Sequence, residues 1–308
     1  NGMATVMTVR GAITPSEFGR VLAHEHVMVD FVGADQTGPH RWDADEVHRL
    51  LMPLLLDVKK RGFDSFVDCT PAYIGRDVEL LRRCSEDADL HILTTTGWYK
   101  EPYLPARAFT QTVDEIADEW TREVEHGIDG TDIYPGFIKI AVNAGSLIDI
   151  QRKIVRAAAP THKRTGLAIA CHTGHGIAAR ETVELLIEEQ VDPGRYIFVH
   201  AESEADREHH KAVADAGGWV EYDAVGWRPT EFHVELLTWA REQGMGPRLL
   251  LSQDSGWYHV GEENGGDIRP FTYLSDDFIP AATEAGIPPE WIEELLTTNA
   301  QAAYAYPG

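Results

Sequence analysis

Histidines and an aspartate stand at the ends of several apolar, β-rich runs of this sequence. His24 and His26 lie one residue apart in the run RVLAHEHV. Because residues i and i+2 of a strand point to the same side, the two imidazoles are expected to face one place. Other runs end in His172, His200 and Asp254. A single histidine at a strand end is more often a hydrogen-bonded structural residue than a ligand, but that explanation does not account for several together.

These residue types are the ligands of catalytic metal ions. Imidazole and carboxylate groups bind zinc, manganese, cobalt and iron. Four histidines and an aspartate are too many for one ion that keeps an open position, and they suit two. Two divalent ions about 3.5–4 Å apart need an anion between them, and a water held by both can lose its proton near neutral pH.

A lysine, Lys139, lies in the apolar run GFIKIAV of the same set. A buried ammonium beside a cationic cluster would be costly and would repel metal ions. The side chain could instead extend to a surface, or it could have a special role. The residues alone leave both readings open. Asp68, Thr96 and Asp223 end further candidate strands.

The elements that must position these side chains alternate between short apolar runs and longer segments of helical period. Most of the runs are almost continuously apolar, which is typical of parallel strands covered on both faces. The candidate strands are residues 20–27, 63–70, 90–97, 136–142, 167–173, 195–202, 218–224 and 248–255.

Helical stretches lie between them, and several end at a glycine. They are predicted at residues 43–61, 112–126, 149–165, 177–190, 204–216 and 231–243, with Pro53 breaking or kinking the first. Eight such units without a linker predict an α/β fold, a single (β/α)8 TIM barrel over residues 1–308, with the active site at the C-terminal ends of the strands. The alternative is a doubly wound open sheet, but no GxGxxG motif follows any strand.

Bulk composition excludes some function classes. The formal net charge of −23 disfavours binding to nucleic acid and to anionic membranes. No apolar run reaches the roughly 18 residues of a membrane span. Three cysteines without CxxC spacing and the lack of a secretory signal near residue 1 predict a reducing, cytoplasmic location.

The ordered set of motifs resembles the phosphotriesterase family of the amidohydrolase superfamily. The resemblance rests on HEH in the first strand, the lysine of the fourth, single histidines ending the fifth and sixth, and the aspartate of LLLSQDSG in the eighth. It extends to the phrases ITPSEFGRVLAHEHV, VRAAAPTHKRTGLAIACHTGHG and FIPAATEAGIPPEWIEELLTTNAQAAYA, and so to nearly the whole chain.

The resemblance implies a role for each of these residues. Two divalent ions, with zinc expected and manganese, cobalt or iron as alternatives, would be bound by His24, His26, Lys139, His172, His200 and Asp254. Lys139 would be N6-carboxylated, so that its carbamate and a hydroxide bridge the ions. The hydroxide would attack the substrate while Asp254 takes the proton. Tyr99 matches a tyrosine that lies beside the metals in the lactonase branch.

Two positions depart from the family patterns. The organophosphate-hydrolysing branch has a histidine where this chain has Ala224 and an aspartate where it has Ser203, and the lactonase branch usually has an arginine in place of Ala224. Neither specificity signature is intact.

The substrate pocket is expected to be formed by loops after strands three, seven and eight. Its aromatic residues favour an apolar acyl or aryl group, although aromatics in barrel loops are more often ordinary packing. Arg228 and Arg269 could bind an anionic group or could be surface residues. The residues expected to form the pocket are Trp98, Tyr99, Trp227, Arg228, Trp257 and Tyr258.

The predicted function is hydrolysis of a small carboxylic ester, with a lactone favoured and phosphotriester hydrolysis as a side activity. Phosphorylated sugar lactones and N-acyl amides are alternative substrates. A non-catalytic binding protein on the same barrel and a one-metal nucleoside deaminase are rival classes. A homodimer is expected because relatives pair, and His209 and His210 are expected at the surface.

Overall fold

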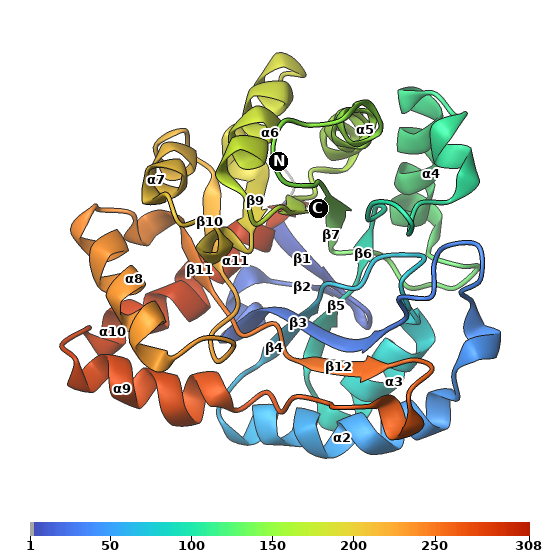
Figure 1. Cartoon of the computed structure of the whole chain (residues 1–308). Helices are drawn as coiled ribbons and strands as arrows, with labels where there is room; N and C mark the ends of the chain where they lie inside the picture. The colour runs from blue at the N-terminus through green and yellow to red at the C-terminus, as the bar shows by residue number, and fades with distance from the viewer. Residues whose placement is uncertain (1–2) are drawn as a thin grey trace.

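The computed structural model describes residues 3–308 and contains eight parallel strands arranged around one centre (Figure 1). Counted in chain order, barrel strands one to three pair as parallel neighbours, and so do barrel strands three to eight. The strands are β3 (Val21–Val29), β4 (Ser65–Asp68), β5 (His91–Leu93) continued by β6 (Thr95–Thr96), β7 (Phe137–Ala141), β8 (Ile169–His172), β9 (Tyr196–Val199), β10 (Trp219–Tyr222) and β11 (Leu249–Leu251).

The first and eighth strands also lie together. After β11, the backbone N–H of Asp254 donates to the carbonyl of His24 at 3.1 Å. The chain then forms an additional strand, β12 (Gly256–His259), which pairs in parallel with β3. The predicted (β/α)8 barrel is therefore confirmed, and β12 is an element that the sequence pattern did not reveal.

Helices surround the strands (Figure 1). They are α2 (Ala44–Lys60), α3 (Val78–Ala88), α4 (Val113–His126), α5 (Asp149–Thr165), α6 (Gly176–Glu188), α7 (Arg207–Asp215) and α8 (Thr230–Glu242), followed by α9 (Ile279–Glu284), α10 (Pro289–Glu294) and α11 (Ala300–Tyr304). Five of the six predicted helices begin and end within two residues of the prediction. The exception, α7, begins later, because a 3-10 turn at Ala201–Ser203 precedes it and Asp206 caps it.

The predicted break at Pro53 is wrong, since α2 continues from Ala44 to Lys60. Pro53 cannot donate to the carbonyl of Arg49. Both residues are on the exposed side of the helix, where water can satisfy that carbonyl.

Three further strands form a small sheet beside the beginnings of the barrel strands. The strands β1 (Ala4–Thr8) and β2 (Gly11–Ile13) form an antiparallel hairpin, and the short helix α1 (Pro15–Phe18) follows it in the chain. The strand β1 also pairs with β13 (Tyr306–Pro307). The N–H of Val9 donates to Ile92 at 2.8 Å, and Arg195 donates to the carbonyl of Ala305 at 3.1 Å. None of the helices within residues 3–308 is both long and apolar enough to cross a bilayer.

Alternation along the strands decides which side chains enter the barrel. One buried apolar cluster takes residues from all eight strands and fills the interior. In β7, Phe137 belongs to this inner cluster while Ile138 and Ile140 pack outside against the helices. Lys139 therefore points inward, because side chains two residues apart share a face.

Candidate metal centre and active site

A cavity of about 220 Å³ lies at the C-terminal ends of the strands. All six residues expected to bind metal line it, together with Tyr99 and Trp257. Phe31, Cys69 and Ile74 complete its wall and were not singled out from the sequence. The six come from β3, β7, β8, the residue directly after β9 and the segment three residues past β11: His24, His26, Lys139, His172, His200 and Asp254.

Local backbone features direct these side chains. His172 follows the inward residue Ala170 by two positions in β8. His200 and Asp254 have positive φ angles of 65° and 46°, so each turns out of its strand direction just past the strand end. In β3 the ladder to β4 is irregular between Leu22 and Glu25. This bulge allows both histidines of the first strand to face the cavity.

His24, His26 and Asp254 form one group. Oδ1 of Asp254 lies 3.3 Å from Nε2 of His24 and 3.1 Å from Nε2 of His26. The burial of His24 lowers its pKa to about 4, so its imidazole is neutral at pH 7. Its Nδ1 donates to Oε1 of Glu221 at 2.9 Å. Nε2 of His24 consequently carries a lone pair aimed at a carboxylate oxygen.

The partner of His26 fixes its tautomer in the same way. The hydroxyl of Thr70 donates to the carbonyl of Met28 at 3.0 Å, so it accepts from Nδ1 of His26 at 2.7 Å. Nε2 of His26 then also presents a lone pair to Asp254. Neither Nε2 of His24 nor Oδ1 of Asp254 has a hydrogen-bond partner among residues 3–308. Lone pairs that converge at this distance need a cation between them, so the residues fit a metal ion.

His172 and His200 form a second group beside the first. Their ring centroids are 4.7 Å apart, and the ring of His200 is 5.0 Å from that of His24. Asp223 accepts from Nδ1 of His200 at 2.6 Å and from its backbone N–H at 2.9 Å, which leaves Nε2 for a ligand. Burial disfavours the charged form of His200, but Asp223 outweighs it and raises the pKa of His200. The pKa of His172 is lowered by burial and by the nearby His200.

Lys139 is 2 % exposed and donates from Nζ to the carbonyl of Cys69 at 3.3 Å. It forms no ion pair within the part of the chain that the structure describes. The ring of Tyr99 lies 5.8 Å from this Nζ. The buried amine of Lys139 thus has no ion-pair partner in the described chain and shares one cavity with four imidazoles and Asp254.

Two buried glutamates, Glu25 and Glu221, hydrogen-bond the residues that carry the site, and neither was predicted from the sequence. Glu25 accepts hydrogen bonds from the hydroxyl of Ser252, from Gln253 N at 3.1 Å and from Ser255 N at 3.0 Å, tying β3 to the segment that carries Asp254. Burial raises the pKa of Glu25 to about 8. Glu221 could have been found from the sequence, because it shares the inward face of β10 with Trp219.

The other strand-end residues do not enter the cavity. Asp68 accepts from the backbone N–H groups of Val27 at 2.9 Å and Thr70 at 3.0 Å. Thr96 donates from its hydroxyl to Glu123 at 2.6 Å, on the helix side. Both residues hold the scaffold together.

The predicted substrate residues divide into two sets. Tyr99 and Trp257 line the 220 Å³ cavity of the predicted metal ligands, called the metal cavity below. Trp257 also lines a second cavity of about 280 Å³ together with Trp227, called the outer cavity. Phe31 is shared by the two cavities, so they adjoin. The residues that line the outer cavity are Phe31, Trp227, Trp257, His259, Asp267 and Arg269.

The structure places Trp98, Arg228 and Tyr258 away from both cavities. Gly97, with φ 98°, turns the chain so that Trp98 packs against Trp120 at 5.5 Å between ring centroids. Alternation in β12 directs Tyr258 toward α2, where its hydroxyl donates to Glu46 at 3.1 Å.

Arg228 is exposed, and its guanidinium lies 4.3 Å from the ring centroid of Phe232. Its side chain is therefore held on the start of α8 rather than over the barrel mouth.

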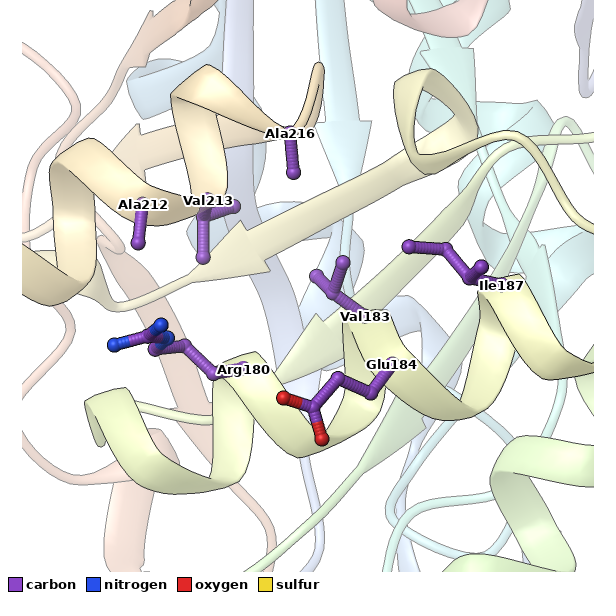
Figure 2. Close-up of a pocket in the computed structure, with 7 residues that line it drawn as sticks. All are labelled: Arg180, Val183, Glu184, Ile187, Ala212, Val213 and Ala216. Carbon is purple, nitrogen blue, oxygen red and sulfur yellow. The ribbon is translucent and has the colours of Figure 1, made fainter.

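A separate groove of about 190 Å³ lies between α6 and α7, in the outer layer of helices (Figure 2). Arg180 and Glu184 are its only charged residues among the described part of the chain, and its remaining wall is aliphatic. No predicted site residue faces it.

Comparison with known proteins agrees with this geometry. The sequence model described as Phosphotriesterase family matches residues 4–304. The chain is 28 % identical to the "Phosphotriesterase homology protein" of Escherichia coli over 91 % of this chain and 96 % of that protein. It is 27 % identical to the "Aryldialkylphosphatase" of Saccharolobus solfataricus, covering 94 % and 96 % of the two chains.

Among solved structures, a mutant of a PTE-like lactonase from Deinococcus radiodurans superimposes with a TM-score of 0.87 at 28 % identity, covering 97 % of this chain and 100 % of that one. The barrel and the site define a metal-dependent hydrolase. The chain belongs to the phosphotriesterase family.

Proposed function

We propose that this hydrolase cleaves a small carboxylic ester, with a lactone as the favoured substrate, at a centre of two divalent metal ions. The observation that carries the proposal is the convergence of unpartnered ligand atoms, above all Nε2 of His24 and Oδ1 of Asp254, in one cavity. The names of the lactonase and aryldialkylphosphatase relatives support ester and phosphotriester substrates for this chain as well.

His24, His26 and Asp254 would hold one ion, and His172 and His200 the other, with zinc favoured over manganese, cobalt and iron. When bound, such a pair activates a water molecule and polarises the scissile carbonyl or phosphoryl oxygen. Asp223 and Glu221 hold the Nδ1 atoms of His200 and His24, which keeps each Nε2 aimed at the cavity.

We propose that Lys139 reacts with CO₂ to give an N6-carboxylated side chain. The neutral amine forms an N–C bond to CO₂ and releases one proton, so a neutral group becomes an anion; starting from the ammonium, two protons are released. Its position without an ion pair among four imidazoles supports this change of charge. The carbamate oxygens would then be ligands shared by the two ions.

Asp254 and Tyr99 would be the catalytic side chains. Asp254 would accept the proton of the attacking water, because its Oδ1 is unpartnered and faces the cavity. The hydroxyl of Tyr99 lies 2.9 Å from Nδ1 and 3.0 Å from Nε2 of His172. Burial raises the pKa of Tyr99, which keeps the phenol protonated and able to donate to the substrate oxygen.

The experiment compares wild type with Lys139→Met, which preserves the length of the side chain but cannot form a carbamate. We expect metal analysis of wild type loaded with zinc and bicarbonate to give two ions per chain. The variant should bind fewer ions and lose at least about 10³-fold in kcat/KM toward lactones. An anomalous-scattering map of the loaded protein that lacks paired ions in the cavity would overturn the proposal.

We also propose that residues 1–308 form one domain, that the protein is a cytoplasmic homodimer, and that it does not bind nucleic acid. A single apolar cluster with residues from all eight barrel strands supports one domain. The net charge of −23 disfavours binding to nucleic acid. Sedimentation equilibrium tests the dimer, and coincident unfolding transitions by fluorescence and circular dichroism test the single domain.

A further inference from the structure

The outer cavity contains a positively charged group that the proposed ester chemistry does not use. Arg269 is partly buried and lines this cavity. Its guanidinium forms no ion pair and no side-chain hydrogen bond with any part of residues 3–308. A guanidinium has five N–H donors, and here none is satisfied by the protein.

The guanidinium is held in place from one side. Its carbon lies 3.7 Å from the ring centroid of Trp227. The indole N–H of Trp227 is itself fixed by the carbonyls of Gln253 at 3.0 Å and Asp254 at 3.1 Å. The indole that stacks on Arg269 is therefore hydrogen-bonded to the backbone of Asp254, a predicted metal ligand.

The backbone of Arg269 is fixed as well. It exchanges two hydrogen bonds with Gly256, at 2.9 Å and 2.8 Å. A cation that is anchored at its backbone and stacked on a fixed ring loses little conformational entropy when it binds an anion.

The outer cavity adjoins the metal cavity through an apolar wall. Trp257 lies 4.0 Å from His26 between ring centroids, and Phe31 stacks on Trp257 at 5.9 Å. A substrate with its ester at His26 would pass these two rings before it reaches Arg269.

We propose that Arg269 recognises an anionic group on the substrate, so that the substrate class is an ester or lactone with an apolar spacer and a terminal carboxylate or phosphate. This inference rests on the proposed function. Bidentate binding by arginine suits both anions. Asp267 lines the same cavity and opposes the anion, but it is exposed, and water and salt weaken its effect.

The test uses γ-lactones with side chains of two to six carbons that end in methyl, carboxylate or phosphate. In wild-type, metal-loaded protein we expect kcat/KM for the best anionic lactone to exceed that of its methyl counterpart at least about 10-fold, and the ratio to fall as salt is added. The carboxylate and phosphate series show which anion the site prefers.

Arg269→Met should reduce kcat/KM for the anionic lactones about 10- to 100-fold and leave the methyl series within about 3-fold. Arg269→Lys should recover part of the loss. Asp267→Asn is the matched control, and it should raise kcat/KM for the anionic series while metal content stays unchanged in all variants. Equal rates for charged and neutral lactones in wild type, or an equal loss of both in Arg269→Met, would overturn the inference.

A binding measurement separates this inference from the proposed function. Calorimetry compares adipate with hexanoate, which differ by the second carboxylate. We expect adipate to bind wild type at least about 10-fold more tightly than hexanoate, and Arg269→Met to abolish the difference. If this difference is found but no lactone is hydrolysed, the ester function is refuted and the anion site stands. If the difference is absent, the anion site is refuted.

Discussion

Glu221 determines which nitrogen of His24 is available to a metal ion. Its carboxylate accepts from Nδ1 inside the barrel, where neither side chain is more than 1 % exposed. We expect Glu221→Leu to weaken metal binding about 10- to 100-fold, because His24 loses both its orientation and its fixed tautomer. Glu221→Gln should have a smaller effect, since its amide oxygen can still accept the bond. Competition with a chelator measures the affinity.

The exposed Glu231 on α8 provides the control, and Glu231→Gln should leave the affinity unchanged. Unaltered metal binding in Glu221→Leu would show that the Nδ1 partner is dispensable. The residue types at the strand ends were sufficient to predict that His24, His26, His172, His200 and Asp254 face one place, whereas the role of Lys139 came from the resemblance. The sequence analysis did not single out Glu221, although its spacing from Trp219 and Asp223 places it on the inward face of β10.

At the scale of elements, β12 depends on a close approach that only glycine permits. Gly256 has φ 90°, and a Cβ there would lie 1.7 Å from the carbonyl oxygen of His26. Gly256→Ala should therefore push β12 away from β3 and lower the free energy of unfolding by about 3 kcal/mol or more. Metal affinity should fall too, because Asp254 is two residues away. Urea denaturation and metal analysis are the measurements.

Gly62→Ala is the matched substitution, since Gly62 has φ 81° but a Cβ there meets no atom within 4 Å. It should cost only the conformational strain, about 1–2 kcal/mol. Equal losses for the two variants would contradict the role of the close approach.

The period of the sequence predicted most of the strands and helices, because hydrophobic alternation depends on local spacing. It could not predict β12 or the direction of Trp98. The strand β12 depends on the positive φ angles of Asp254 and Trp257, and the direction of Trp98 depends on that of Gly97. The bulge in β3 also has no local signature, because it is set by pairing with β4.

At the scale of the whole molecule, buried histidines make stability depend on pH. His210 was expected at the surface but is 1 % exposed, because it points inward from α7 to the hydroxyl of Tyr222 at 2.9 Å and the carbonyl of Glu204 at 2.9 Å. Burial lowers the pKa of His210 to about 4 from 6.5. The folded protein thus prefers neutral His210, while the unfolded chain takes up a proton below pH 6.5.

The contribution of His210 to stability should be complete above pH 6.5 and decrease, by up to about 3 kcal/mol, as the pH falls to 4. Urea denaturation at pH 7.5 and 4.5 should therefore show a smaller pH dependence for His210→Gln than for wild type. His126→Gln, at an exposed position in α4, should retain the wild-type dependence. An identical pH dependence in all three proteins would refute this account.

The pairing of β1 with β13 places residues 4–5 against residues 306–307, beside the beginnings of the barrel strands. Both ends of the described chain thus leave the molecule on the side opposite the catalytic mouth. A tether fused at either end would anchor the protein to a solid support with its opening toward the solution. A linker joining the two ends should likewise allow new termini to be opened in an exposed loop.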